Sequence, residues 1–184
     1  MDTAQPVFAD LYFMHQQHKE SHADADWAWI LVIQRRVIAV LTVRRGRSVA
    51  CDGTSYPPRA VVSLLCGTRA EGRVTPPLIE YATKHLESEY RLKLFRSGKA
   101  SPRGLRALEN LLEVDPVAVH NTERHDEPSA SVRYFCEWEV RTMEDDEVER
   151  LEDTCDLQLS EAQYLFDNGR FRLLEENVIL PRNA

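Results

Sequence analysis

The most apolar stretch of the chain, residues 27–43, reads WAWILVIQRRVIAVLTV and is divided by a polar Gln-Arg-Arg triplet at 34–36. Each half has the length of a strand and is rich in β-branched residues, which favours strands over one buried helix. Neither half approaches the ~20 apolar residues of a membrane-spanning helix. We therefore expect two central strands, 27–33 and 37–44, joined by a turn and covered on both faces, and no membrane span.

Shorter segments elsewhere also have strand character. In residues 132–141 apolar and largely polar side chains alternate, which predicts a strand with one buried and one solvated face. Val, Leu and Cys dominate residues 60–66, which lie between stretches of turn and loop residues. We expect the sheet to contain both segments and three further strands, at 7–14, 171–174 and 178–180.

Start signals for two helices follow one another in the middle of the chain. Thr-Pro at 75–76 and Ser-Pro at 101–102 each place a capping side chain ahead of a proline. Proline is tolerated in the first turn of a helix, because the N–H that it lacks would have no partner within the helix. Apolar residues then recur at helical spacing, as far as Leu94 in the first helix, which Gly98 is expected to stop. The two helices would form an αα-hairpin over about 75–113.

Two short helices are expected after this hairpin, an acidic one at 144–153 and another at 160–167. Strands thus flank a helical centre without regular strand–helix alternation, which favours an α+β fold over a doubly wound sheet. A chain of 184 residues can build one domain with a proper core but is short for two. We predict a single α+β domain over 1–184: a mainly antiparallel sheet with a central αα-hairpin and short C-terminal helices.

The four cysteines are widely spaced and form no CxxC or Cys/His finger pattern. Reduced core thiols compete with a pair of disulfides in a secreted protein. The N-terminal residues MDTAQPVFAD are acidic and lack a long apolar run, so no signal peptide is expected. Reduced thiols and a cytoplasmic location are therefore favoured. The cysteines are Cys51, Cys66, Cys136 and Cys155.

The sequence contains none of the compact catalytic or nucleotide-binding motifs GxxxxGK[ST], GxGxxG, GxSxG and HExxH. His15, His18 and His22 would share one helix face and could bind a transition metal, but HQQHKESHADAD is equally typical of a polar connector. We therefore predict no metal site, no cofactor and no enzymatic activity.

Two other groups of residues have some chemical potential. Glu137 and Glu139 lie on one face of the expected strand, where paired carboxylates can do acid–base work, but cross-strand charge pairing explains them more simply. Cys51 precedes Asp-Gly at 52–53 and could be a nucleophile, but no partner histidine can be assigned to it from the sequence.

Acidic residues are concentrated in one part of the chain. Residues 137–161 contain eleven acidic and two basic residues, a net charge of −9, whereas the whole chain carries −7. Charge of one sign on a surface speeds encounter with an opposite partner, although it also aids solubility alone. The candidate partner-binding residues are Glu144, Asp145, Asp146, Glu147, Glu149, Glu152 and Asp153.

A basic stretch has the opposite character. Residues 91–106 contain six Lys or Arg and no acidic residue. Arg103, Arg106 and Asn110 fall on one side of the second expected helix, and Arg and Asn are the residue types that bind guanine and adenine edges. A five-residue turn and a long first helix fit a helix-turn-helix poorly. The candidate nucleic-acid-binding residues are Lys99, Arg103, Arg106 and Asn110.

These features favour a non-enzymatic protein-binding module, an inhibitor or adaptor whose acidic face docks on a basic, nucleic-acid-handling protein, alone or within a nucleoprotein complex. In being small, acidic and poor in motifs, the chain is similar to accessory proteins of phages and plasmids, including anti-CRISPR inhibitors. That likeness is compositional and rests on no specific positions. A DNA- or RNA-binding regulator that uses the basic segment is the alternative, and a small enzyme with an unrecognised site is the second alternative.

Overall fold

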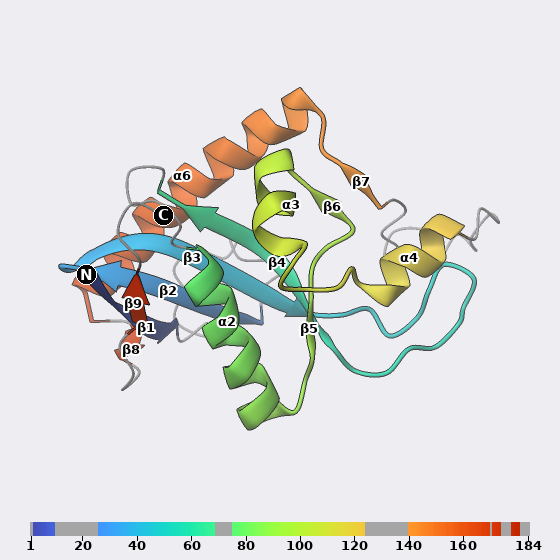
Figure 1. Cartoon of the computed structure of the whole chain (residues 1–184), viewed down its shortest axis with the longest axis horizontal. Coiled ribbons are helices and arrows are strands. Elements are labelled where there is room, and N and C mark those ends of the chain that lie inside the picture. Colours follow the sequence, from blue (N-terminus) through green and yellow to red (C-terminus); the bar gives the residue numbers. More distant parts are fainter. Residues whose placement is uncertain are drawn as a thin grey trace.

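The computed structural model describes residues 2–9, 26–68, 75–123, 140–169, 171–173 and 178–180. Its centre is a curled, antiparallel-rich sheet with the strand order β5-β4-β3-β2-β1-β8, in which β9 also pairs with β1 (Figure 1). Within the described residues only the β4–β5 pair of this sheet is parallel. The mixed α+β content and the mainly antiparallel sheet are thus confirmed. The strands are β1 (Asp2–Ala9), β2 (Trp27–Ile33), β3 (Arg36–Arg45), β4 (Ala60–Gly67), β5 (Leu94–Phe95), β8 (Phe171–Leu173) and β9 (Val178–Leu180).

Strands β2 and β3 are buried on both faces, as their continuous apolarity predicts. Because side chains alternate along a strand, Trp29 and Leu31 enter one core, while Ile30 and Val32 enter another on the opposite face. Helices therefore cover the central strands from both sides.

The turn between β2 and β3 is a tight two-residue hairpin turn. Gln34 and Arg35 have φ values of 48° and 65°, and positive φ at both central positions is typical of a type I′ turn. Gln163 of the C-terminal helix holds this turn, because it accepts a bond from Val37 N at 2.8 Å and donates one to Arg35 O at 3.0 Å.

One face of the sheet is covered by α2 (Thr75–His85), a π-helical turn η2 (Leu86–Tyr90) and α3 (Pro102–Leu108) (Figure 1). Ser101 caps α3, since its hydroxyl accepts a bond from Gly104 N at 3.0 Å, as the Ser-Pro signal predicts.

The predicted αα-hairpin is not confirmed. The helical run ends at Arg91, which has a φ of 55°, rather than reaching Leu94 and stopping at Gly98. Leu94 and Phe95 instead pair with β4, because the start of β4 offers a free edge. A further strand, β6 (Lys99–Ala100), follows before α3. Two strands thus separate the helices that the sequence predicts to be neighbours.

The opposite face is covered by α6 (Asp145–Asp167), one 23-residue helix in place of the two short helices expected there. Residues 154–159 contain neither Gly nor Pro, so nothing interrupts the helix. Gln158, Ala162 and Leu165 are buried under it. The buried stripe runs from before Ser160 to after it, although the sequence predicts that a new helix starts there.

Two smaller elements complete the described fold. Strand β7 (Arg141–Thr142), just before α6, pairs in parallel with β6. Helix α4 (Pro116–Glu123) packs beside the loop between β3 and β4 through several polar contacts.

The cysteines differ from expectation. Cys66 of β4 and Cys155 of α6 form a disulfide with their Cα atoms 5.3 Å apart, Cys51 is also disulfide-bonded, and no described cysteine is a free thiol. The prediction of reduced thiols is therefore wrong for these three residues. Sequence spacing could not show it, because Cys66 and Cys155 are 89 positions apart and meet only when α6 lies on the sheet.

Several predicted features lie outside the described residues. They are His15, His18 and His22, the Glu137–Glu139 pair, and most of the strands expected at 7–14 and 132–141, of which 7–9 fall within β1. Among the described residues, no helix is both long and apolar enough to span a bilayer.

Candidate functional site

Helix α6 presents a continuous exposed face opposite its buried stripe. Residues at helical spacing form this face, which we call the outer α6 face, and all of them are exposed. The helix contains nine acidic residues and a single basic one, Arg150. The outer α6 face consists of Asp146, Glu149, Asp153, Asp156, Leu157, Ser160 and Tyr164.

The outer α6 face also has an apolar part. Leu157 is 55% exposed and Tyr164 is 58% exposed, and the two are seven positions apart, so they lie on the same side of the helix. These two side chains give an otherwise charged helix face some apolar area that an interface could bury. Neither residue can be recognised from the sequence, because Leu157 and Tyr164 fit an inward-facing stripe until the burial of the helix is known.

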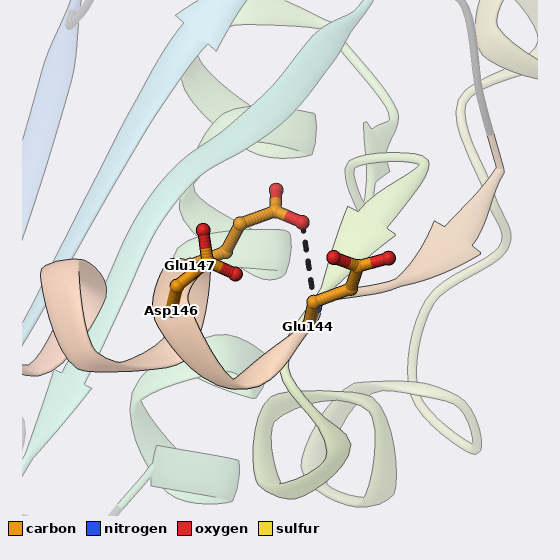
Figure 2. Close-up of side chains that lie close together, drawn as sticks. All are labelled: Glu144, Asp146 and Glu147. Atoms are coloured by element: carbon orange, nitrogen blue, oxygen red, sulfur yellow. Dashed lines mark hydrogen bonds between the residues drawn. The ribbon is translucent and has the colours of Figure 1, made fainter.

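The first turn of α6 brings three carboxylates close together (Figure 2). Glu144, Asp146 and Glu147 each place a carboxylate oxygen within 4.8 Å of the others. Glu147 reaches back to the Glu144 backbone amide, with its Oε1 accepting a bond at 3.3 Å, and forms a capping box with it. Acidic residues in a first turn are also stabilised by the helix dipole.

Glu147 is neutralised within the protein. Its carboxylate accepts two bonds from the Arg141 guanidinium, at 2.7 and 3.0 Å, and Lys99 Nζ lies 3.5 Å away. The hydrogen bonds from Arg141 lower the pKa of Glu147 from 4.5 to about 2. A carboxylate with these partners has little left to offer a metal ion or a binding partner, so the cluster is explained by the capping of α6.

The candidate partner-binding residues therefore separate into two groups. Glu147 is half-buried and serves the fold, whereas the other six are exposed along the first half of α6 or at its cap. Asp146 faces Arg150 one turn later at 3.3 Å, in a pair that is open to solvent and contributes little to stability. The exposed candidates are Glu144, Asp145, Asp146, Glu149, Glu152 and Asp153.

The basic candidates are divided in the same way. Lys99 pairs with Glu147, because β6 and β7 lie side by side and bring the basic segment to the start of α6. Arg103 and Arg106 are exposed on α3, and Asn110 is exposed in the turn that follows it. Helix α3 has only seven residues, so these side chains do not lie on a long recognition helix.

A separate polar cluster joins the β3–β4 loop to α4. Asp52 Oδ2 lies 2.8 Å from His120 Nε2, and His120 Nδ1 lies 2.7 Å from the Tyr56 hydroxyl. The hydrogen bond from His120 and those from Thr54 hold the pKa of Asp52 well below its usual range. The three side chains form one hydrogen-bonded chain from carboxylate to imidazole to phenol.

Cys51 takes no part in this chain. It is disulfide-bonded, and its backbone amide donates a 2.7 Å bond to Asn121 Oδ1. The interpretation of Cys51 as a nucleophile is therefore wrong, because the sulfur is already bonded. A histidine does lie beside the segment that follows Cys51, but its contacts are with Asp52 and Tyr56. The 64 positions between Tyr56 and His120 hide this arrangement from motif analysis.

Comparisons with known proteins add no assignment. The chain matches no protein-family model, and neither the curated proteins nor the solved structures contain a significant match to it.

Proposed function

We propose that this protein is a non-enzymatic binding module, an inhibitor or adaptor that docks the outer α6 face on a basic surface of a nucleic-acid-handling protein. The observation that carries the proposal is the composition of that face, where exposed carboxylates lie next to Leu157 and Tyr164. The carboxylates favour a cationic partner, and the apolar side chains give the contact an area to bury.

The design of α6 supports this assignment. The helix is held to the sheet by its buried stripe, by Gln163 at the β2–β3 turn, and by the Cys66–Cys155 disulfide. A rigid helix loses little conformational entropy when a partner binds, so less of the interaction energy is spent on ordering. The outer α6 face is thus presented on a fixed support.

The partner we propose has clustered Lys and Arg around a small apolar patch. Proteins that hold nucleic acid carry such basic surfaces, so an acidic helix can compete with the phosphate backbone for them. The likeness in composition to phage and plasmid accessory proteins, anti-CRISPR inhibitors included, agrees with this class of partner. No specific position supports that likeness.

Direct nucleic-acid binding by Arg103, Arg106 and Asn110 is the alternative proposal. Their exposure supports it. The shortness of α3 and the pairing of Lys99 with Glu147 weigh against it, since both reduce the basic surface available to phosphates.

Capture of partners from host lysate, with and without nuclease, separates the two proposals. A partner that survives nuclease treatment and is lost from a Leu157→Ser/Tyr164→Ser variant supports docking through the outer α6 face. Both side chains are exposed, so this variant should keep its stability. Recovery that requires intact nucleic acid, and is lost from Arg103→Ala/Arg106→Ala instead, contradicts docking and supports the alternative.

The cytoplasmic location predicted from the sequence stays a proposal, and the disulfides argue against it, because the cytosol keeps most thiols reduced. Alkylation of the protein in rapidly quenched host cells decides the point. Free thiols at Cys66 and Cys155 support the cytoplasm, and an intact bond supports an oxidising compartment.

A further inference from the structure

The Asp52–His120–Tyr56 chain has the connectivity of an activated nucleophile. In catalytic triads, a carboxylate orients an imidazole, and the imidazole accepts the proton of the attacking hydroxyl. Here the carboxylate belongs to Asp52, the imidazole to His120 and the hydroxyl to Tyr56, with heavy-atom distances of 2.8 and 2.7 Å. Both distances are within the range of good hydrogen bonds.

The chemistry of Asp52 decides which way the protons lie. An ionised carboxylate can only accept, so its bond with His120 requires His120 Nε2 to donate. In the neutral imidazole, Nδ1 is then an acceptor, and the Tyr56 hydroxyl must donate to it. This is the arrangement in which a histidine can take the proton from a phenol.

The loop that carries two of these residues is firmly positioned. Asp52 Oδ1 accepts a bond from Thr54 N at 3.0 Å, and Gly53, with a φ of 87°, makes the tight turn between them. Tyr56 N donates to Ser48 O at 2.8 Å, and Cys51 N is bonded to Asn121 beside His120. The reacting groups are thus held in place before any substrate arrives, which is what efficient attack requires.

We propose that Tyr56 is a nucleophilic tyrosine that accepts an acyl group from an activated ester or thioester, with His120 as its general base and Asp52 as a positioning residue. This acceptor site is independent of the outer α6 face. It makes one covalent bond to the protein and requires no metal or redox partner.

The proton and electron movements balance. A lone pair of Tyr56 Oη attacks the carbonyl carbon as the hydroxyl proton passes to His120 Nδ1, and the bond from that carbon to the leaving oxygen or sulfur breaks. The leaving group departs as an anion, and the ionised Asp52 stabilises the imidazolium until it returns its proton to solvent. The product is an acyl-tyrosine ester.

The test is acetylation of the whole protein by 4-nitrophenyl acetate at pH 7.5, mapped residue by residue by mass spectrometry. Tyr90 is an internal control, because its side chain is more exposed than that of Tyr56. Tyr90 is 41% exposed, whereas Tyr56 is half-buried. Accessibility alone predicts faster modification of Tyr90. The Asp52–His120–Tyr56 chain predicts that Tyr56 is modified about 100-fold faster than Tyr90, which is within the range that general-base assistance supplies.

Two variants test whether His120 activates the Tyr56 hydroxyl or only packs against it. His120→Gln keeps a hydrogen-bonding side chain but removes the base, so the rate at Tyr56 should fall to that at Tyr90. Asp52→Asn should also lower the rate, because an amide neither holds the imidazole in the same tautomer nor stabilises the imidazolium that forms.

Three results would overturn the proposal: equal rates at Tyr56 and Tyr90 in the unmodified sequence, acetyl transfer that ends on His120, or wild-type rates at Tyr56 in folded His120→Gln. If either variant fails to fold, the comparison of the two tyrosines in the original chain still decides. Tyr56→Phe should lose only the Tyr56 adduct.

Discussion

At the scale of single residues, the ion pair between Arg59 and Asp115 is costly to disturb because both partners are buried. Both side chains are 3% exposed, and Arg59 Nε lies 2.5 Å from Asp115 Oδ1. Arg59 also donates to Arg47 O, and Asp115 accepts a bond from Val117 N in the first turn of α4. The pair therefore joins the β3–β4 loop to the helix that carries His120.

Replacing Asp115 by Ala should lower the free energy of unfolding by about 3–5 kcal/mol, because it leaves a buried guanidinium without its counter-charge. Urea denaturation measures the loss. Glu113→Ala is the matched control, since its pair with Lys93 is well exposed and should be worth about 0.5 kcal/mol. Equal effects of the two substitutions would contradict the burial of the Arg59–Asp115 pair.

Glu147 should make stability depend on pH. Its pKa is lowered to about 2 in the folded protein, from an ordinary value of 4.5. A lowered pKa means that the folded state binds fewer protons, so the contribution is fully present above about pH 5 and is lost as the pH falls towards 2.

Glu147→Gln tests this dependence, because Gln keeps the capping box but not the charge. The variant should be less stable than the original chain at pH 7, and the difference should shrink steadily between pH 5 and pH 2. Urea titrations at several pH values give the difference directly. A gap that stays constant over this range would show that the pairing with Arg141 and Lys99 contributes nothing through charge.

At the scale of secondary-structure elements, local chemistry was enough for some segments and not for others. The two central strands follow from their apolar, β-branched halves, and α3 begins at its Ser-Pro signal. The end of the first helical run is set by Arg91 in a left-handed conformation, for which Arg gives no sequence signal. Leu94 continues the helical pattern, yet it joins the sheet together with Phe95, because β4 has an edge to pair.

Arg91→Gly should therefore raise the free energy of unfolding by about 1 kcal/mol, because Gly adopts a positive φ without the clash of a Cβ atom. Arg91→Ala removes the same charge but keeps the Cβ, so it should bring no gain. Thermal or urea unfolding of both variants provides the comparison. Equal stabilisation by Ala would assign the effect to charge and not to backbone conformation.

The candidate sites also combine features that the sequence predicts with features that depend on the tertiary structure. The acidity of α6 is visible in the sequence, but the internal pairing of Glu147 depends on β7 lying beside β6. The roles of Leu157 and Tyr164 depend on which face α6 buries. The Asp52–His120–Tyr56 chain depends on a contact across more than sixty residues, which no local pattern encodes.

At the scale of the whole molecule, the Cys66–Cys155 disulfide joins the sheet to the helix that we propose as the docking element. It closes a long loop, and cross-links of this kind stabilise mainly by restricting the unfolded chain. The double variant Cys66→Ala/Cys155→Ala should lose about 2–4 kcal/mol of stability. Urea denaturation without reductant checks this, and an unchanged midpoint would contradict a stabilising cross-link.

Reversing the charge of the outer α6 face tests whether this face binds a basic partner. Asp146→Lys/Glu149→Lys/Asp153→Lys is compared with Glu87→Lys/Glu89→Lys/Glu109→Lys, an equal change of charge at exposed positions outside α6. We predict that the α6 variant, while still folded, loses nuclease-resistant capture of its partner and that the control retains it. Capture that survives the α6 reversal, or that fails equally in both variants, would contradict the proposed function.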